Sequence, residues 1–344
     1  MGRALIGAGS AMGRGAMGEG LVDTQLRFSV VVCAYTEQRW DDLVAAIGSL
    51  DAQTHPPEEV IVVVDHNPAL AQRCLSELPD VIPGVICVEN RGRQGLSDAR
   101  NTGLESAHGD VVAFLDDDAE AEPGWLAVLA RGFEDPDVVA VGGFADPVWA
   151  DGRPGWFPRE FDWVVGCTYL GMPEEAAPVR NLIGCNMSYR REVFDEVGGF
   201  TAGIGRVGAR PVGCEETELC IRIGQRRPGS VILFDPAAVV HHRVPAQRGT
   251  WGYFRSRCYA EGLSKAAVAS LVGAERGLAS ERRYSTRTLP QGVLRGLAAG
   301  FRGERAGFGR AAAIVAGVSI AAAGYGIGRL SPKGEATPGL VPAS

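Results

Sequence analysis

Short apolar runs alternate with helical patterns through the first third of the chain. Four runs are rich in β-branched residues and have the length of strands buried on both faces, at 28–34, 59–65, 85–88 and 111–116. Residues 41–50 and 96–106 have the spacing of apolar residues that is typical of amphipathic helices. Strands and helices that alternate in this way predict an α/β fold with a doubly wound, mostly parallel, Rossmann-like sheet.

The pattern is less regular after residue 137. Strand-like runs stand at 138–144, 181–189, 231–234 and 238–240, whereas 146–161 has the Pro, Gly and aromatic content of a loop. Helices are predicted from residue 214, where acids occupy the first turn, and over 250–271. Because no repeat or long linker interrupts the pattern, we expect one domain over 28–270. A disordered leader is expected over 1–27, and a helical extension with a flexible tail over 271–344.

Composition excludes some classes of function. The net charge of −7 argues against a general nucleic-acid binder, and a hydrophobic content of 46% is ordinary for a globular protein. The 8 cysteines are scattered and form no CxxC pair, which favours a reduced, cytoplasmic protein.

Acidic residues end two of the predicted strands. Asp116, Asp117 and Asp118 follow one strand directly, and Asp65 ends another. At the carboxyl ends of parallel strands these side chains would face one crevice, where open α/β sheets bind ligands. Adjacent carboxylates repel one another, so a cation such as Mg²⁺ or Mn²⁺, shared with substrate phosphates, would stabilise them. The alternative is a solvated acidic turn whose Asp side chains cap the next helix.

Several motifs in order resemble the inverting glycosyltransferases of family 2, which have the GT-A fold, over residues 28–265. Asp116-Asp117-Asp118 matches the DXD motif, whose last Asp is usually the metal ligand. Cys214-Glu215-Glu216 matches the ED motif that carries the catalytic base. The pair His241-His242 falls where many members of the family have a histidine near the diphosphate. The resemblance implies a nucleotide-sugar site formed by Ala34, Tyr35, Glu37, Asp65, Gly95, Arg100, Asp116 and Asp117.

Two departures and one ambiguity affect these roles. The second position of the ED motif is Glu216 in place of Asp, so Glu216 is the expected base and Glu215 either the alternative base or its orienting group. His66 follows Asp65 where relatives have a second acid. Strand alternation points His241 and His242 to opposite faces, so we expect only one, His242, to join Asp118 and Asp116 at the metal.

The resemblance implies metal-dependent transfer of a sugar, with inversion, from a nucleoside-diphosphate donor, expected to be UDP, to an acceptor hydroxyl. The segments at 184–187 and 261–266 are most similar to enzymes that act on lipid-phosphate sugars, including glucuronosyltransferases, in cell-envelope glycan or glycolipid synthesis. Two alternatives are a silent sugar-nucleotide-binding scaffold and a nucleotidyltransferase. The latter would need a Gly-rich basic loop after the first strand, and residues 35–38 are not one.

The C-terminal extension contains an uncharged run at 311–327, made mostly of Ala and Gly. A spanning helix needs about 20 apolar residues, with a lower limit near 17. Arginines that could meet anionic headgroups flank the run, at Arg302, Arg305, Arg310 and Arg329. We expect the tail to lie at or in the inner face of the plasma membrane and to bring the crevice to a lipid-linked acceptor. The alternative is a core helix packed on the catalytic domain.

Overall fold

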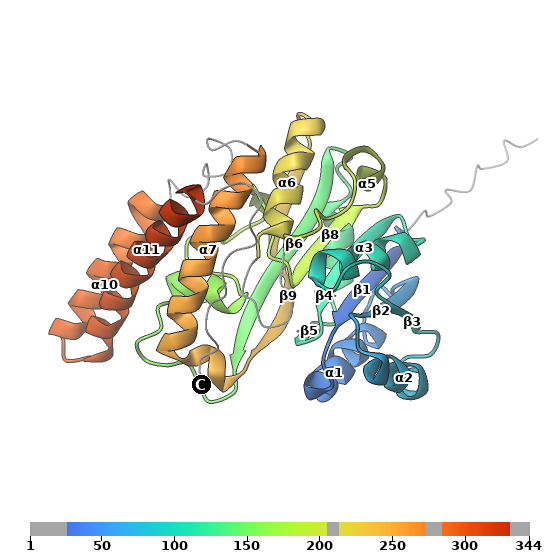
Figure 1. Ribbon diagram of the computed structural model, residues 1–344, viewed down its shortest axis with the longest axis horizontal. Helices are drawn as coiled ribbons and strands as arrows, with labels where there is room; N and C mark the ends of the chain where they lie inside the picture. The colour runs from blue at the N-terminus through green and yellow to red at the C-terminus, as the bar shows by residue number, and fades with distance from the viewer. Residues whose placement is uncertain (1–25, 205–212, 273–283, 331–344) are drawn as a thin grey trace, which may run out of the picture.

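One mixed, mostly parallel sheet organises the protein (Figure 1). The computed structural model describes residues 26–204, 213–272 and 284–330. Within them the strands are β1 (Phe28–Ala34), β2 (Glu59–Val64), β3 (Ile86–Glu89), β4 (Val111–Asp116), β5 (Ala119–Ala121), β6 (Val138–Trp149), β7 (Ala177–Pro178), β8 (Asn186–Arg190) and β9 (Val231–Val244). Their order is β3-β2-β1-β4-β8-β6-β9-β5, with β7 paired to β9. The first four strands are parallel, and β8 enters antiparallel between β4 and β6.

Helices cover both faces of this sheet. They are α1 (Trp40–Asp51), α2 (Pro68–Glu77), α3 (Leu96–Ser106), α4 (Trp125–Gly132), α5 (Glu192–Val197), α6 (Glu215–Arg226), α7 (Trp251–Val272), α10 (Leu289–Phe301) and α11 (Ala306–Leu330). Short helical turns are η1 (Glu37–Arg39), η2 (Leu78–Asp80), η3 (Arg159–Val165), η4 (Ala246–Gly249) and η5 (Tyr284–Thr288). The sheet and its helices have the doubly wound architecture that the pattern predicts.

The strands are apolar throughout because both of their faces are buried. Val30 and Val32 of β1 belong to the core that α1 and α2 cover, whereas Val31 packs into the opposite core under α3. The contact with α3 is close: a Cβ at Gly103 would lie 2.3 Å from Val31 Cγ1. Glycine at this position therefore sets the height of α3, and with it the position of its side chains, above the sheet.

The structure differs from the sequence pattern in the second half of the sheet. Residues 146–149, predicted as loop, continue β6, because Asp146 pairs with His241 and Trp149 with Val244. The two predicted runs at 231–234 and 238–240 form one strand, β9, which bends where its pairing with β6 shifts register at Gly143 and Phe144. Long-range pairing, rather than local propensity, extends both strands.

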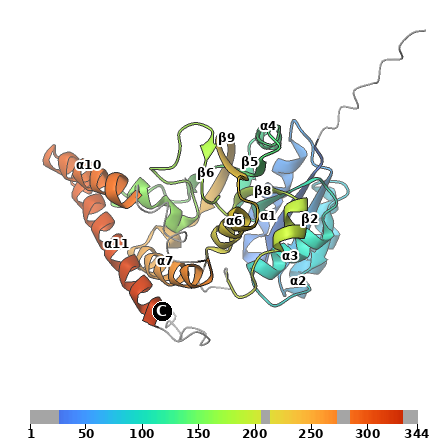
Figure 2. The ribbon, with the colours of Figure 1, turned by 90° about the horizontal axis from the view of Figure 1, so that it is seen from above.

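The two C-terminal helices lie beyond α7, on the side away from the parallel strands (Figure 2). α7 and α11 approach closely through glycines, since a Cβ at Gly262 would lie 2.1 Å from the Ala321 carbonyl oxygen, and one at Gly324 would lie 2.3 Å from that of Tyr259. α11 is long and apolar enough to cross a membrane, by length and composition, and only 28% of its most apolar window is buried. Residues 1–25 of the expected leader and 331–344 of the expected tail lie outside the described residues.

Candidate active site

Two adjoining cavities open where the parallel strands end. The larger, of about 490 Å³, extends from Asp116 and Asp118 past Glu216 to α11. The smaller, of about 60 Å³, lies beside β1 and β2 and is lined by Ala34, Tyr35 and Asp65, together with Asp116 and Asp117. Asp116 lines both cavities, so the acidic triplet stands at their junction.

A cluster of potential metal ligands lies at this junction. One ligand atom each from Asp116, Asp118 and His242 lies within 4.8 Å of the others. His242 reaches the cluster because β9 pairs with β5 directly after the triplet, with Ala119 opposite His242. Its Nε2 is 3.2 Å from Asp118 Oδ1, and both side chains are buried.

His241 does not join the cluster. Its side chain is 41% exposed, and its nitrogens lie 3.2 Å from Glu122 Oε1 and 3.4 Å from Asp146 Oδ2. Successive side chains of a strand point to opposite faces, so the same pairing that brings His242 in turns His241 out.

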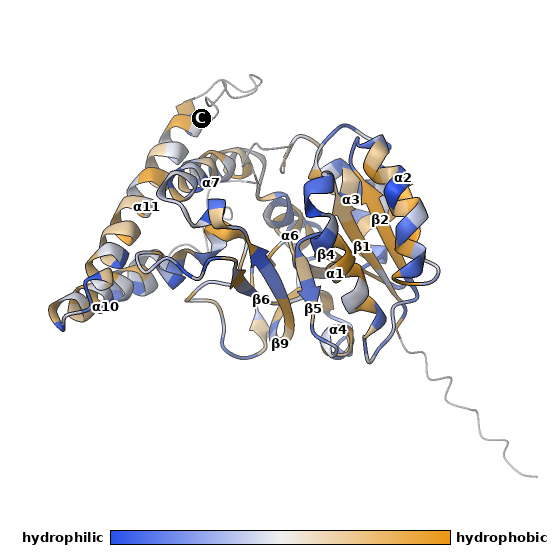
Figure 3. Ribbon diagram, turned by 90° about the horizontal axis from the view of Figure 1, so that it is seen from below, coloured by the Kyte–Doolittle hydropathy of each residue, from blue (hydrophilic) through white to orange (hydrophobic). Residues whose placement is uncertain are grey.

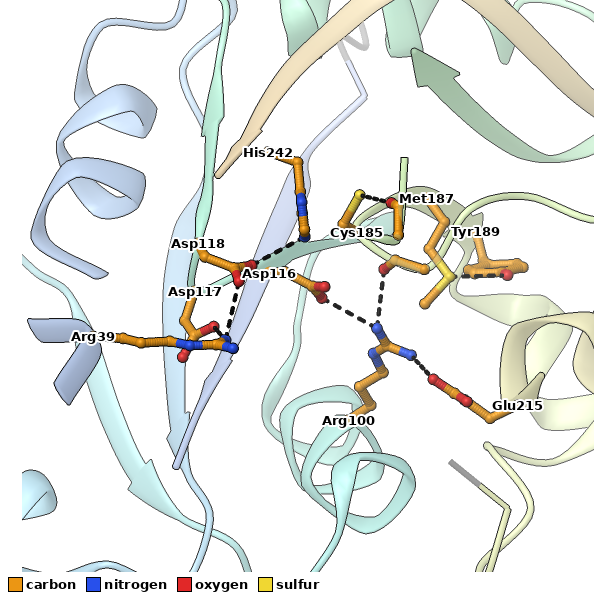
Figure 4. Close-up of polar contacts among 12 residues, drawn as sticks. Arg39, Arg100, Asp116, Asp117, Asp118, Cys185, Met187, Tyr189, Glu215 and His242 are labelled. Atoms are coloured by element: carbon orange, nitrogen blue, oxygen red, sulfur yellow. Dashed lines mark hydrogen bonds and ion pairs between the residues drawn. The ribbon is translucent and has the colours of Figure 1, made fainter. Parts of the chain in front are cut away.

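Two arginines that the sequence analysis missed also contact the triplet. Arg39 Nη1 is 2.7 Å from Asp117 Oδ1 and 3.1 Å from Asp118 Oδ2, and Arg248 Nη2 is 3.3 Å from Asp118 Oδ2 (Figure 4). Arg39 comes from η1, whose first residue follows the N-cap Thr36, and Arg248 comes from η4 after β9. Neither belongs to a recognisable motif. The signal in the sequence would be only that Arg39 follows β1 closely and that Arg248 follows His242 closely.

These neighbours set the protonation of the cluster. Burial alone would raise the pKa of Asp118, but His242, Arg39 and Arg248 outweigh it and hold that pKa well below its usual range. Burial would lower the pKa of His242, and the Asp118 carboxylate raises it instead. Burial and the charge of Asp118 together raise the pKa of Asp117 to about 7.

The residues present fit a divalent cation. Two carboxylates and an imidazole are a donor set that Mn²⁺ accepts, and the carboxylates alone suit Mg²⁺. Among the described residues, Asp117 Oδ2 is buried without a hydrogen-bond partner. The guanidinium groups of Arg39 and Arg248 both contact one oxygen of this cluster, Asp118 Oδ2.

Arg100 lies beneath the site rather than on the protein surface. Its Nη1 is 2.7 Å from Glu215 Oε1, and its Nη2 is 3.3 Å from Asp116 Oδ1 and 3.0 Å from the Gly184 carbonyl oxygen (Figure 4). Arg100 and Glu215 are both almost fully buried. Arg100 therefore links the first acid of the triplet to the first acid of α6, and Glu215 is held by this pair.

Glu216 has a different environment from its neighbour. It is half-buried, lines the larger cavity and accepts a hydrogen bond from Thr217 Oγ1 at 3.2 Å. Burial, followed by the charge of Glu215, raises the pKa of Glu216 to about 8. A carboxyl group with a pKa near neutrality is suited to accept a proton from an attacking hydroxyl.

Both carboxylate oxygens of Asp65 accept hydrogen bonds from other residues of the chain. Asn90 Nδ2 donates to Asp65 Oδ1 at 2.7 Å, and the Gly95 backbone N–H donates to Oδ2 at 2.9 Å. Gly95 has φ of 142°, which a residue with a side chain rarely adopts, and it leads directly into α3. Asp65 thus fixes the loop before α3 while lining the smaller cavity.

The other predicted nucleotide residues divide into two groups. Ala34 and Tyr35 line the smaller cavity, where the Tyr35 ring lies 5.5 Å from the Arg39 guanidinium. Glu37 is exposed on η1 and lines neither cavity. The structure therefore brings the predicted residues together except for Glu37 and His241.

Comparisons with known proteins show the family of the chain. Residues 29–198 match the sequence model of Glycosyl transferase family 2. The chain is 38% identical over 241 residues to glucosyl-dolichyl phosphate glucuronosyltransferase of Haloferax volcanii, covering 70% of this chain and 76% of that protein. It is 27% identical over 270 residues to the succinoglycan biosynthesis protein ExoM of Rhizobium meliloti, covering 73% of this chain and 82% of that protein.

A solved structure shares the fold. The mannosyltransferase PcManGT from Pyrobaculum calidifontis, solved in complex with GDP-Man and Mn²⁺, superposes with a TM-score of 0.54 at 20% identity, covering 86% of both chains. This likeness confirms the predicted GT-A fold. From its family match, its 38% identical relative and the acidic site at the strand ends, the chain belongs to glycosyl transferase family 2 and is a glycosyltransferase with a nucleotide-sugar donor.

Proposed function

We propose that the protein transfers a sugar, with inversion, from a UDP-sugar to a hydroxyl group of a lipid-linked acceptor, using Mn²⁺ or Mg²⁺. The observation that carries the proposal is the placement of two chemically different sites in one cavity. Asp116, Asp118 and His242 form the cation cluster, and Glu216 lines the same cavity from α6.

The donor would occupy the junction of the two cavities. The smaller cavity suits the nucleoside, with Tyr35 available to stack on the base and Asp65 holding the loop over it. The diphosphate would then reach the cation held by Asp116, Asp118 and His242. Arg39 and Arg248 supply further positive charge at this point.

The chemistry needs a base and a stabilised leaving group. Glu216 would accept the proton of the acceptor hydroxyl as its oxygen attacks the anomeric carbon, and the bond to the diphosphate would break on the opposite side. When bound, the cation would supply positive charge, which would offset the negative charge that develops on the diphosphate. Glu215, paired with Arg100, is a positioning residue that holds the start of α6 against the triplet.

The name of one relative and the surface of the protein support a lipid-linked acceptor. The Haloferax volcanii relative is named for a glucosyl-dolichyl phosphate acceptor, a lipid-linked sugar. In this chain, α10 and α11 project from the side of the sheet domain and carry many apolar residues (Figure 3). Their exposed large apolar side chains are Leu294, Leu297, Phe301, Phe308, Val315, Val318, Ile327 and Leu330. We propose that this apolar surface of α10 and α11 contacts the inner face of the plasma membrane.

The test is a donor panel with product analysis. Full-length protein is incubated with UDP-, GDP- and dTDP-sugars and Mn²⁺, and stabilisation against heat is measured for each donor. A glucosylated lipid phosphate is then added as acceptor, and the reaction products are identified. We expect one UDP-sugar to stabilise the protein and to yield free UDP with a β-configured product from an α-configured donor. Release of pyrophosphate in a parallel incubation with UTP and a sugar 1-phosphate would identify a nucleotidyltransferase, and binding without turnover would identify a scaffold.

A further inference from the structure

His242 has a hydrogen-bond partner at each of its ring nitrogens, and only one of these partners belongs to the cation cluster. Its Nε2 lies 3.2 Å from Asp118 Oδ1 (Figure 4), whereas its Nδ1 lies 3.6 Å from Cys167 Sγ. The Cys167 side chain is buried and, like that of His242, lines the larger cavity. The donor and base chemistry described above does not use this thiol, so its contact with a candidate metal ligand calls for a different role.

The backbone on both sides of Cys167 holds the thiol in place. Gly166 ends η3 with φ of 85°, and the backbone N–H of Cys167 donates to the Asp162 carbonyl oxygen at 3.1 Å. On the other side, the Thr168 N–H donates to the Ala145 carbonyl oxygen at 3.0 Å, and Thr168 Oγ1 accepts from the Ala145 N–H at 2.8 Å. Ala145 belongs to β6, which pairs with β9, the strand that carries the imidazole. The thiol and the imidazole are therefore fixed to neighbouring strands of one sheet.

The direction of these hydrogen bonds follows from what each atom can donate. The Cys167 thiol donates to the Val165 carbonyl oxygen at 3.9 Å, which leaves the lone pairs of its sulfur available to His242. A cation can bind Nε2 of a neutral imidazole only when the hydrogen is on Nδ1. The Nδ1–H group then donates to Cys167 Sγ. A hydrogen bond from the second ring nitrogen is what usually fixes the tautomer and the orientation of a histidine that binds a metal.

We propose that Cys167 is a positioning residue, which orients the His242 ring and favours the tautomer whose Nε2 is free to bind the cation. This inference rests on the proposed function, to which it adds a residue that controls the cation site. Imidazole nitrogen suits Mn²⁺, whereas Mg²⁺ prefers oxygen ligands. The thiol should therefore strengthen the binding of Mn²⁺ more than that of Mg²⁺.

The test measures cation binding without sugar transfer. Full-length protein with saturating UDP is titrated with Mn²⁺, bound Mn²⁺ is measured from the loss of the electron paramagnetic resonance signal of the free ion, and Mg²⁺ affinity is measured by competition. Cys167→Ala should raise the Kd of Mn²⁺ by about 10-fold, at the lower end for such outer partners because sulfur is a weak acceptor. The Kd of Mg²⁺ should rise much less. Cys167→Ser, which keeps an acceptor at this position, should bind Mn²⁺ more tightly than the Ala variant.

Two further variants separate positioning from a general loss of structure. Cys185→Ala is the matched control, because the Cys185 thiol is also buried and lines the same cavity but donates to the Gly166 carbonyl oxygen at 3.4 Å. It should bind both cations like the wild type. In a His242→Ala background, Cys167→Ala should have no further effect on Mn²⁺ binding, because the thiol acts only through the imidazole.

The outcomes distinguish this inference from the proposed function. Unchanged Mn²⁺ binding in Cys167→Ala would show that the thiol has no such role. An equal loss of Mn²⁺ and Mg²⁺, or a full effect of Cys167→Ala without His242, would show that the thiol only supports the local structure; each of these results overturns the inference and leaves the cation cluster standing. If the wild type bound no Mn²⁺ in the presence of UDP, the cation cluster of the proposed function would fail, and this inference with it.

Discussion

Replacing Arg100 with methionine tests the buried ion-pair network that joins the triplet to α6. The Arg100 and Glu215 side chains are 3% and 6% exposed, and their charged atoms are 2.7 Å apart. At that distance, and at an effective dielectric constant of about 20, the gross attraction is about 6 kcal/mol before desolvation is subtracted. Removing one partner leaves the other charge buried and alone, which costs about 3–5 kcal/mol.

Arg100→Met should therefore lower the free energy of unfolding by about 3–5 kcal/mol, a fall in Tm on the order of 10 °C. The double variant Arg100→Met/Glu215→Gln should recover much of this loss, because no isolated carboxylate remains at position 215. Mn²⁺ affinity should fall in both variants, since Asp116 loses the guanidinium that lies 3.3 Å from its Oδ1. Thermal unfolding and Mn²⁺ titration measure the two effects separately.

The matched control is the surface pair of Arg27 and Asp110. Its distance of 2.9 Å is similar, but the two side chains are 52% and 44% exposed. Arg27→Met should change the free energy of unfolding very little and leave Mn²⁺ binding unchanged. If Arg100→Met proved as mild as Arg27→Met, or if the double variant were no more stable than the single one, the network would not have the role assigned to it.

The remaining predictions concern the cation cluster, the base and the apolar surface. Asp118→Ala should abolish transfer and the Mn²⁺-dependent stabilisation by UDP, and normal metal-dependent turnover in this variant would refute the cluster. Glu216→Gln should lower kcat by roughly 10²-fold or more while UDP still binds, and wild-type kcat/KM should rise with pH through about 8 as the base loses its proton. Because the folded-state pKa of Glu216 exceeds its usual 4.5, the wild type should also lose stability as pH rises from 4.5 towards 8, in a way that the Gln variant does not. Leu294→Glu/Phe301→Glu should shift the protein from the membrane fraction to the soluble fraction with UDP binding intact, whereas unchanged sedimentation with anionic vesicles would exclude this surface as the contact.

Point substitutions are preferable to truncation for that last test, because α11 is part of the packed structure. Ala313 and Ile314 belong to the main core, and a Cβ at Gly317 would lie 2.4 Å from the Phe161 ring. Removing the chain after Thr288 would expose this core and one wall of the cavity. The two alternatives for the tail are thus not exclusive, since one side of α11 packs on the domain and the other remains apolar and exposed.

The sequence by itself determined the parallel half of the sheet and most of the residues that gather at the candidate site. A strand buried on both faces must be apolar along its whole length, so β1, β2 and β4 are visible as short Val- and Ile-rich runs. Carboxylates directly after such runs are expected at the carboxyl edge of a parallel sheet, which is why Asp65 and the triplet could be predicted there without a structure. Alternation along a strand similarly separated His242 from His241.

Only the tertiary structure decided which charges meet. No motif in the sequence marks Arg39 or Arg248, and Arg100 was expected only at the nucleotide sugar. All three contact the acids because distant elements converge at the strand ends. The raised pKa of Glu216 likewise depends on its burial and on the charge of Glu215 beside it, whereas Arg100 contacts Glu215. The course of the cavity from Asp118 to Val318 depends on how α11 packs on α7, through contacts between residues about sixty positions apart. Local patterns record burial and periodicity, whereas ion pairing and cavity shape arise from segments that meet only when the chain is folded.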